Sequence, residues 1–239
     1  MTTLHRHPTE HSIDAVLVTP ETFEVGAARR SFDIAAAAVL LVLCLPILAA
    51  AALLVKLTDG GAVLFRQERL GEGGTTFRLV KLRTMRSGEG PGVTATGDPR
   101  ITRVGRVLRR TSVDELPQLW HVLCGRMTLV GPRPESVTLA AAYPASCRFV
   151  LAARPGLTGP AQLRYRESAA SPPAGMDVES WYLTRLVPLR VAADLDFLID
   201  PTMTRTLLYV WRTALFVVGL HDPSGPETPG PATESRPAS

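Results

Sequence analysis

A long apolar segment near the beginning of the chain dominates its hydrophobic pattern. No charged residue lies between Ile34 and Val55, and about 20 apolar residues are enough for a helix to cross a bilayer. Basic residues flank both ends, because Arg29 and Arg30 precede the segment and Lys56 follows it. Positive charge near membrane segments tends to stay on the cytoplasmic side, so this pattern argues against a simple crossing.

Pro46 lies near the middle of this segment, where a proline removes a backbone hydrogen bond and kinks a helix. Two interpretations fit these residues. The segment forms either a helix that enters the membrane, breaks at Leu45–Pro46 and returns to the same face, or a kinked transmembrane helix, in which proline is tolerated. The segment starts too late for a signal peptide, and an Arg-rich region follows it directly.

The pattern after the apolar segment predicts two strands around a glycine-rich turn, in "AVLFRQERLGEGGTTFRLVKLRTM". The turn lacks the GK[ST] ending of a phosphate-binding P-loop, so we interpret it as a hairpin turn. Residues 86–99 are a polar loop rich in Gly, Pro and Thr. In "RITRVGRVLRR", Ile101, Val104 and Leu108 share one helical face. The arginines around them can face an anionic membrane surface, an anion site or plain solvent.

The second half of the chain alternates rigid corners with helical patterns. "MTLVGPRPE" predicts a strand that runs into a Gly-Pro-Arg-Pro corner, and "RPGLTGPAQ" is a second corner of this kind. Residues 177–199 and 202–219 have helical character. The whole pattern predicts an α+β fold, in which a membrane helix precedes a small, helix-rich domain with a short β-hairpin and amphipathic helices.

Composition narrows the class of partner without choosing one. The 239 residues carry a formal net charge of +4, with a pI near 9.3 and a mean hydropathy of +0.13. A basic domain favours nucleic acid, anionic lipid or phosphorylated substrates. The three cysteines are far apart and form no CxxC pair, so neither a zinc site nor a disulfide framework is indicated. They are Cys44, Cys124 and Cys147.

The adjacent carboxylates of Asp114 and Glu115, in "RRTSVDELPQLWHVL", have two interpretations. Ser112 stands three residues before Glu115, so "SVDE" matches a capping box, and the helix dipole would favour both acids in the first turn. Alternatively, the two acids are catalytic, because a carboxylate can attack phosphorus and form an acyl phosphate. Mg²⁺ and arginine side chains would then hold the phosphate oxygens. The candidate arginines are Arg83, Arg109, Arg110, Arg133 and Arg154.

An ordered series of motifs between Arg29 and Gln162 resembles the bacterial sugar transferase family, the monotopic phosphoglycosyl transferases. The series consists of "RRSFD", "FRQERLG", "FRLVKLRTM", "DPRITRVGRVLRRTSVDELPQLWHVLCGRMTLVGPRPE" and "RPGLTGPAQ". The order and number of these motifs make the resemblance specific. It departs from the family at Leu45–Pro46, where Ser-Pro is common, and at His121, where Asn is common.

The resemblance implies transfer of a sugar 1-phosphate from a UDP-sugar to undecaprenyl phosphate, with release of UMP. In the family's dyad, Asp114 would attack the β-phosphorus and carry the phosphosugar. Glu115 would position the aspartate or assist the proton and metal arrangement of the site. Mg²⁺ is the expected cofactor, with Asp114 near it. Substrate phosphates would be bound by Arg109, Arg133, Arg83 and Lys81. The competing interpretation is an inactive, membrane-anchored scaffold related to the family.

The resemblance also implies a location and a domain plan. The family's re-entrant helix places both termini and the catalytic domain on the cytoplasmic side of the bacterial inner membrane. We therefore predict a tail over residues 1–28, a re-entrant helix over 29–58, a catalytic domain over 59–221 and a disordered tail over 222–239. The expected partners are the UDP-sugar, undecaprenyl phosphate and the inner leaflet, together with possible homo-oligomer formation. Nucleic acid is not expected, because a nucleic-acid module would leave the acidic pair without a purpose.

Overall fold

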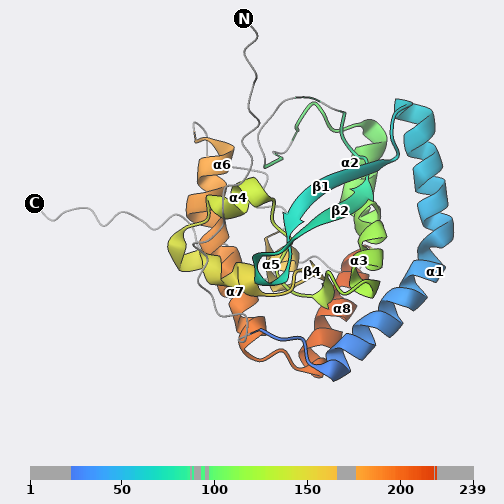
Figure 1. Cartoon of the computed structure of the whole chain (residues 1–239). Coiled ribbons are helices and arrows are strands. Elements are labelled where there is room, and N and C mark those ends of the chain that lie inside the picture. The colour runs from blue at the N-terminus through green and yellow to red at the C-terminus, as the bar shows by residue number, and fades with distance from the viewer. Residues whose placement is uncertain are drawn as a thin grey trace, which may run out of the picture.

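A small mixed body with one long helix along its side makes up the computed structural model of the chain (Figure 1). The structure describes residues 23–86, 88, 93–94, 97–165, 176–217 and 219. The predicted C-terminal tail, 222–239, most of the predicted N-terminal tail and half of the polar loop 86–99 lie outside these residues. Between them, helices and two small sheets alternate, so the predicted α+β class is confirmed.

The apolar segment forms a single helix, α1 (Ala27–Asp59), with Pro46 inside it. The predicted break into two helices at Leu45–Pro46 is therefore wrong. Proline removes one backbone hydrogen bond and crowds the preceding turn, which bends a helix without ending it when good helix formers continue on both sides. Figure 1 shows such a change of direction near the middle of α1. The helix ends at Gly60, whose left-handed backbone (φ 69°) lets its N–H bond the Lys56 carbonyl.

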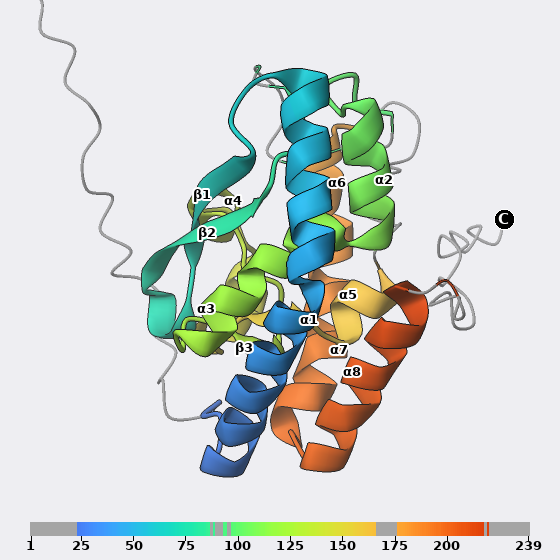
Figure 2. The same ribbon diagram turned by 90° about the vertical axis from the view of Figure 1, so that its right-hand side faces the viewer.

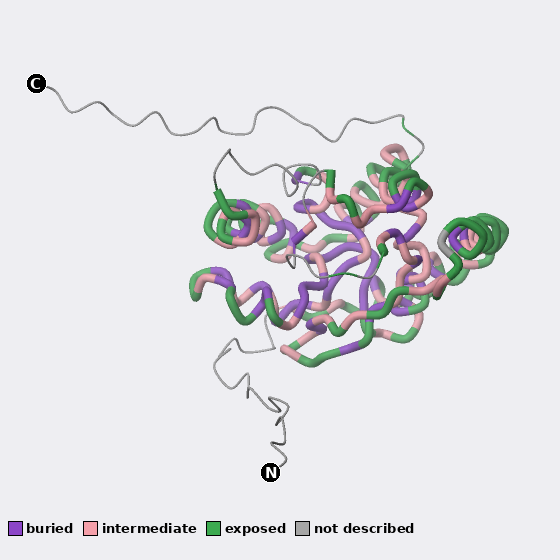
Figure 3. Tube along the Cα trace, turned by 90° about the horizontal axis from the view of Figure 1, so that it is seen from above, coloured by how far each residue is buried: buried purple, intermediate pink, exposed green. Residues whose placement is uncertain are grey.

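Among the described residues, α1 is the one helix long and apolar enough to cross a membrane. Only 11% of its most apolar 18-residue window is buried inside the protein. Most of its apolar surface is therefore exposed and available for contact with lipid or another apolar surface. Figure 3 shows the contrast, with buried segments inside the body and α1 largely exposed at one side.

The body holds α1 near both of its ends. Near the beginning, Ala37 is fully buried against the core around Leu119 and Val122. Near the other end, Ala51 and Val55 are buried in a second cluster with residues of the hairpin and of the next helix. No residue of α1 between Ala37 and Ala51 is buried. The middle of the helix is therefore much less packed on the body than its two flanks, although Leu41 and Leu48 still touch the two clusters.

Polar side chains near the N-terminal end reinforce this packing. Arg30 donates to the carbonyls of Val122 and Leu123, at 2.7 and 3.0 Å. Asp33 is fully buried and accepts a 2.5 Å hydrogen bond from the Thr128 hydroxyl. The "RRSFD" motif thus ties α1 to the body.

The predicted hairpin is confirmed. Strands β1 (Leu64–Leu70) and β2 (Thr76–Leu82) pair in antiparallel register, with Gln67 opposite Leu79. The turn between them includes a short 3₁₀ segment, η2 (Glu72–Gly74), where a positive φ explains the glycines of the sequence. The far end of β2 leads towards the acidic pair, because β2 packs against the segment that carries it.

The two predicted corners meet as a second, parallel sheet. It consists of β3 (Thr128–Val130) and β4 (Gly156–Thr158). The remaining elements surround the two sheets, and Figure 2 shows α2, α3, α5 and α8 on the side of the body that faces α1. These elements are α2 (Arg103–Thr111), η3 (Val113–Gln118), α3 (Leu119–Leu123), α4 (Val137–Ala141), η4 (Ala145–Ala152), α5 (Pro160–Arg164), α6 (Val178–Trp181), η6 (Tyr182–Leu186), α7 (Val187–Ile199) and α8 (Met203–Val217).

The helices predicted over 177–199 and 202–219 are present, but the first contains a feature that periodicity did not indicate. Its α-helical turns are interrupted at η6, a π-helical turn of five residues. A π-helical turn rotates the side chains that follow it relative to those before it, and such turns are frequent at functional sites. The buried side chain at its start, Tyr182, points into the body.

Candidate active site

The acidic pair lies on η3, directly after a sharp reversal of the chain at Ser112. This residue has left-handed backbone angles (φ 58°, ψ 13°), rare for a side chain other than glycine. It ends α2, and its carbonyl accepts from the Glu115 N–H at 3.0 Å. Its hydroxyl makes no cap, so the predicted capping box is wrong. An N-cap residue needs an extended backbone. Ser112 is the one residue between α2 and η3, and the left-handed backbone with which it ends α2 excludes that conformation.

Asp114 is the buried member of the pair, with 4% of its surface exposed. Burial, and then the neighbouring Glu115 carboxylate, raise its pKa to about 6. Three cations, Lys81, Arg109 and Arg133, oppose this shift and keep the carboxylate ionised above that pH. The structure thus brings four of the predicted site residues, Glu115, Lys81, Arg109 and Arg133, together around the buried carboxylate of Asp114.

Glu115 faces a different partner from Asp114. Its Oε1 accepts a hydrogen bond from Nη2 of Arg133 at 3.1 Å, which is also an ion pair. This carboxylate is the main reason why the pKa of the Arg133 guanidinium is raised above its usual value. The two acids therefore have separate environments, as expected for neighbours on a helical turn that point in different directions.

Lys81 reaches the pair from the end of β2. Burial lowers the pKa of its ammonium to about 8, while Asp114 and Glu115 act in the opposite direction. The ammonium also lies 5.4 Å from the centre of the Phe65 ring, on the partner strand. An ammonium held in this way is charged at neutral pH and available to a phosphate oxygen.

Arg109 comes from α2, and burial lowers the pKa of its guanidinium although Asp114 favours the charged form. Its Nη1 lies 3.1 Å from the Met85 sulfur. Arg83 lies elsewhere. A Cβ placed on Gly61 would be 2.0 Å from Arg83 Nη1, so this guanidinium packs over the chain just after α1. No interaction between Arg83 and the acidic pair is found among the described residues.

Close backbone packing between the two corners positions Arg133. The N–H of Gly131 donates to Thr158 at 2.9 Å, and the N–H of Gly156 donates to Pro132 at 2.7 Å. A Cβ on Gly156 would lie 2.1 Å from the Gly131 nitrogen, so glycine is required at this approach. The Gly-Pro-Arg-Pro corner is therefore held by the second corner, and Arg133 projects from it towards Glu115.

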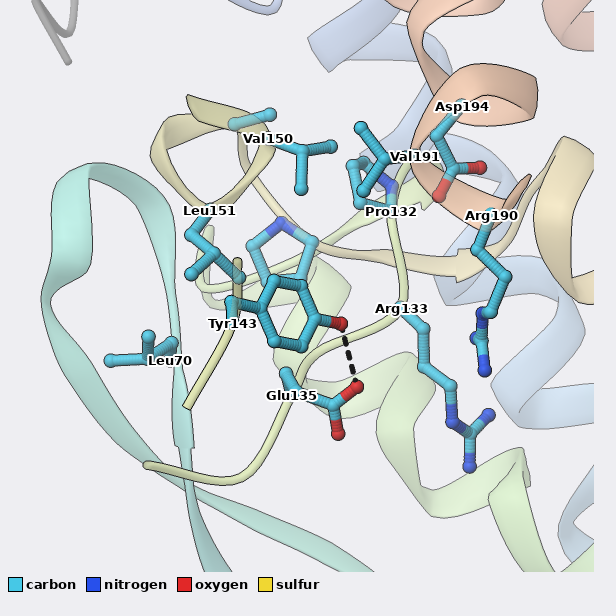
Figure 4. A pocket seen from close by; sticks show the side chains of 12 residues that line it. Leu70, Pro132, Arg133, Glu135, Tyr143, Val150, Leu151, Arg190, Val191 and Asp194 are labelled. Atoms are coloured by element: carbon cyan, nitrogen blue, oxygen red, sulfur yellow. Dashed lines mark hydrogen bonds between the residues drawn. The ribbon is translucent and has the colours of Figure 1, made fainter. Parts of the chain in front are cut away.

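Behind Arg133 lies a buried network that the sequence interpretation missed (Figure 4). Its centre is Glu135, which is 5% exposed. One of its carboxylate oxygens accepts the hydroxyls of Tyr143 (2.9 Å) and Tyr182 (2.5 Å). The other lies 3.4 Å from Arg69 Nη1 on β1. The "PRPE" motif already contained the signal, since Glu135 directly follows the corner that carries Arg133.

His121, at the position where the family often has Asn, links α3 to β2. Its Nε2 accepts the Val80 N–H at 3.1 Å, next to Lys81 in the chain, and its ring contacts Phe77 edge-on. Burial lowers the pKa of the imidazole, which suits the neutral form that this hydrogen bond requires. The residue is buried and supports the strand that carries Lys81.

The donor chemistry around Asp114 fits a magnesium ion that is shared with a substrate. No cluster of three or more metal-ligating side chains occurs within the described parts of the chain. Mg²⁺ typically binds one or two carboxylates and completes its shell with water and substrate phosphates. The neighbouring carboxylates of Asp114 and Glu115 meet that requirement, whereas they would be a poor cage for a metal without substrate.

A buried carboxylate among cations, close to an exposed apolar helix, is typical of a protein that binds anionic groups at an apolar surface. Comparison with known proteins is more specific. The model of the bacterial sugar transferase family matches residues 25–218, and the chain belongs to this family.

Characterised relatives cover most of the chain. A UDP-glucose:undecaprenyl-phosphate glucose-1-phosphate transferase of Caulobacter vibrioides is 44% identical over 195 residues, which are 79% of this chain and 69% of the relative. The exopolysaccharide production protein ExoY of Rhizobium meliloti is 36% identical over 207 residues, covering 79% of this chain and 84% of ExoY. A UDP-N-acetylgalactosamine-undecaprenyl-phosphate N-acetylgalactosaminephosphotransferase of Aeromonas hydrophila is 35% identical over 179 residues, which are 72% of this chain and 42% of the relative.

Proposed function

We propose that this protein transfers a sugar 1-phosphate from a UDP-sugar to undecaprenyl phosphate, with release of UMP, as a membrane step of exopolysaccharide or glycoconjugate assembly. The observation that carries the proposal is the burial of Asp114 among Lys81, Arg109 and Arg133. One nucleophilic carboxylate and three phosphate-binding cations are the groups that phosphoryl transfer needs. The names of the family and of the relatives support the substrates.

The reaction has two displacements at the same phosphorus. In the first, a carboxylate oxygen of Asp114 forms a bond to the β-phosphorus, and the bond from that phosphorus to the bridging oxygen breaks. UMP leaves with the electron pair, and the sugar phosphate stays on the protein as an acyl phosphate. In the second, an oxygen of undecaprenyl phosphate attacks that phosphorus, and the Asp114 carboxylate leaves. Both nucleophiles are anions, so neither step has to remove a proton from its attacking oxygen.

The other residues of the site act on charge and position. Lys81, Arg109 and Arg133 bind the phosphate oxygens, on which negative charge concentrates during the displacement. Glu115 holds Arg133 and keeps its guanidinium next to the nucleophile. When bound, Mg²⁺ would be held by Asp114 and Glu115 and would neutralise part of the diphosphate charge.

The attachment of α1 supports a re-entrant, monotopic anchor. The stretch between the buried residues Ala37 and Ala51 is about 20 Å long at 1.5 Å per residue, whereas the hydrocarbon core of a bilayer is about 30 Å thick. Both flanks of this stretch pack on the same body. A helix held in this way can dip into one leaflet and return, and it keeps the active site at the surface where a lipid phosphate is found.

A labelled donor tests the covalent step. We expect UDP-glucose labelled at the β-phosphate to leave label on the wild-type protein, and Asp114→Asn to acquire none. Asp196→Asn, a matched change at an exposed carboxylate, should label as the wild type does. Full turnover by Asp114→Asn would overturn the nucleophile. If no UDP-sugar labels the wild type or yields UMP, the protein is the inactive scaffold instead.

Cysteine labelling tests the anchor. Gly26→Cys and Thr58→Cys lie at exposed positions near the two ends of α1, and Cys44 and Cys124 can be replaced by Ser to leave only the buried native thiol. A re-entrant helix predicts that an impermeant reagent reaches both positions only from the cytoplasmic side. Labelling of the two positions from opposite sides would reject the proposal.

A further inference from the structure

Three arginines surround Glu135, and two of them have a carboxylate partner. Arg69 pairs with Glu135 at 3.4 Å, and Arg133 pairs with Glu115 at 3.1 Å. The third, Arg190, comes from α7 and has no carboxylate within ion-pair distance among the described residues. Asp194, one turn further along α7, lines the same pocket, but burial raises its pKa to about 7. The cluster therefore has more positive than negative charge below that pH.

Arg190 is nevertheless held in a defined position. Its Nη1 donates to the Tyr182 hydroxyl at 3.3 Å, and its guanidinium lies 5.8 Å from the centre of that ring. The same hydroxyl donates to Glu135, so one oxygen accepts from the arginine and donates to the acid. Tyr182 is the first residue of the π-helical turn η6. This turn thus orients the side chain that holds the arginine.

The guanidinium of Arg190 lies next to that of Arg133 and points the same way, as Figure 4 shows. The two charges repel, since Arg133 disfavours the charged form of Arg190. Both side chains line one small pocket that is partly open to solvent. Two adjacent guanidinium groups in a pocket are suited to one anion that contacts both of them.

The place of Arg190 in the fold indicates which anion this is. Figure 1 shows α6 and the beginning of α7 on the side of the body away from α1. The lipid phosphate arrives at the membrane, next to α1, whereas the nucleotide arrives from the aqueous side. Arg133 lies close enough to influence the charge of both Asp114 and Arg190, so it links the acidic pair to this pocket. A diphosphate with its β-phosphorus at Asp114 can therefore extend past Arg133 to Arg190.

We infer that Arg190 binds the α-phosphate of the nucleotide, the phosphate that leaves in UMP, and that Tyr182 positions it for this contact. The inference rests on the proposed function, because it takes a nucleotide diphosphate as the donor. Arg190 contacts the leaving group, while Arg133 spans the leaving group and the phosphate that is transferred. Loss of Arg190 then weakens the binding of both UDP-sugar and UMP and leaves the acceptor site unchanged.

The test measures the binding of UMP and of uridine to the full-length protein in lipid nanodiscs, together with steady-state kinetics. Arg190→Gln is expected to weaken UMP binding about tenfold to a hundredfold, which is the range for loss of a charge-assisted hydrogen bond. The KM for UDP-glucose should rise likewise, with uridine affinity and the KM for undecaprenyl phosphate unchanged. Tyr182→Phe leaves the charge of Arg190 in place but removes the hydroxyl that positions it. This variant should weaken UMP binding about threefold to tenfold and leave uridine affinity unchanged.

Arg185→Gln is the matched control, because it removes an exposed charge from the same helical segment and should leave UMP binding unchanged. Unchanged UMP binding in Arg190→Gln would overturn the inference. An equal loss of uridine binding would overturn it as well, because a contact to the base or a folding defect would then be the cause. A rise confined to the KM for undecaprenyl phosphate would assign Arg190 to the acceptor instead. If the wild type binds no UMP, the proposed function itself fails.

Discussion

Arg133 Nη2 lies 3.1 Å from Glu115 Oε1, so the corner that follows β3 is joined to the helical turn that carries the acidic pair. The side chains of Arg133 and Glu115 are 37% and 21% exposed to solvent. An ion pair so exposed adds little to stability. Its value lies in geometry, because it fixes a guanidinium beside the Asp114 carboxylate and leaves other N–H groups for a substrate.

Arg133→Lys tests this geometry, because it keeps the charge and removes the planar fork. We expect the KM for UDP-sugar to rise about tenfold, since lysine cannot bond Glu115 and a phosphate in the same way. Thermal unfolding should shift little. Arg148→Lys, a similar change at an arginine that bonds only backbone carbonyls in the described structure, should leave the KM unaltered. A KM for Arg133→Lys equal to that of the wild type would remove Arg133 from the site.

We expect Lys81 to set an alkaline limit on activity. Burial lowers the pKa of its ammonium to about 8, so the charge is present below this pH and is lost as the pH rises through it. We expect kcat/KM for UDP-sugar to fall above pH 8 in the wild type. In Lys81→Arg the charge persists, because guanidinium titrates above pH ~12, and the fall near pH 8 should disappear. An identical alkaline limb in this variant would assign that limb to another group.

Asp194 makes stability depend on pH. Its buried carboxylate accepts the Ala161 N–H at 3.1 Å, and burial raises its pKa to about 7. An unfolded Asp titrates near pH ~4, so between these two values the folded state keeps a proton that the unfolded state has lost. Protonation of the folded carboxyl therefore contributes fully to the free energy of unfolding below pH ~4. The contribution is lost as the pH rises towards 7, by on the order of 4 kcal/mol.

Asp194→Asn keeps a carbonyl acceptor for Ala161 and cannot ionise. Its Tm should therefore rise relative to that of the wild type as the pH goes from 5 to 8. Differential scanning fluorimetry over this range measures the change, with the exposed Asp196→Asn as the control. A Tm difference that is constant across these pH values would show that Asp194 does not titrate there.

The left-handed backbone of Ser112 predicts an unusual order of tolerated side chains. Ser112→Gly removes the strain of a side chain at φ 58° but also loosens the unfolded chain, so stability should change by less than ~1 kcal/mol. Ser112→Val adds a β-branched side chain and should destabilise by about 2 kcal/mol. Thr111→Val, one residue earlier within α2, is the matched control. A Ser112→Val protein as stable as the Gly variant would contradict the backbone argument.

Local patterns predicted those parts of the fold that local interactions determine. The hairpin followed from two apolar strands around Gly73 and Gly74, and β3 followed from the apolar run before Gly131. The gathering of Lys81 and Arg133 around Asp114 was expected from the ordered family motifs, not from spacing, because these residues come from different elements. The structure brings them together, and their roles in binding and catalysis stay predictions.

The missed features depend on contacts that a one-dimensional pattern does not contain. Tyr182 reaches Glu135 from 47 positions away in the chain, and Arg190 bonds that tyrosine, through a π-helical turn that apolar periodicity does not indicate. "SVDE" matched a capping box because its side chains are suitable, but the short distance from α2 to η3 left Ser112 no extended conformation. Pro46 bent α1 where a break was predicted, because helix formers continue on both sides.

The attachment of α1 at both flanks fixes the position of this helix relative to the body that carries Asp114. A helix joined to a domain at one end can tilt to match bilayers of different thickness, but α1 is fixed by the Ala37 contacts at one flank and by the Val55 contacts at the other. In the proposed anchor, the depth of α1 in the lipid and the height of Asp114 above the acyl chains would change together. Lipid composition would then affect turnover, because the membrane, and not a hinge, would set how far a polyprenyl phosphate has to rise to meet the carboxylate.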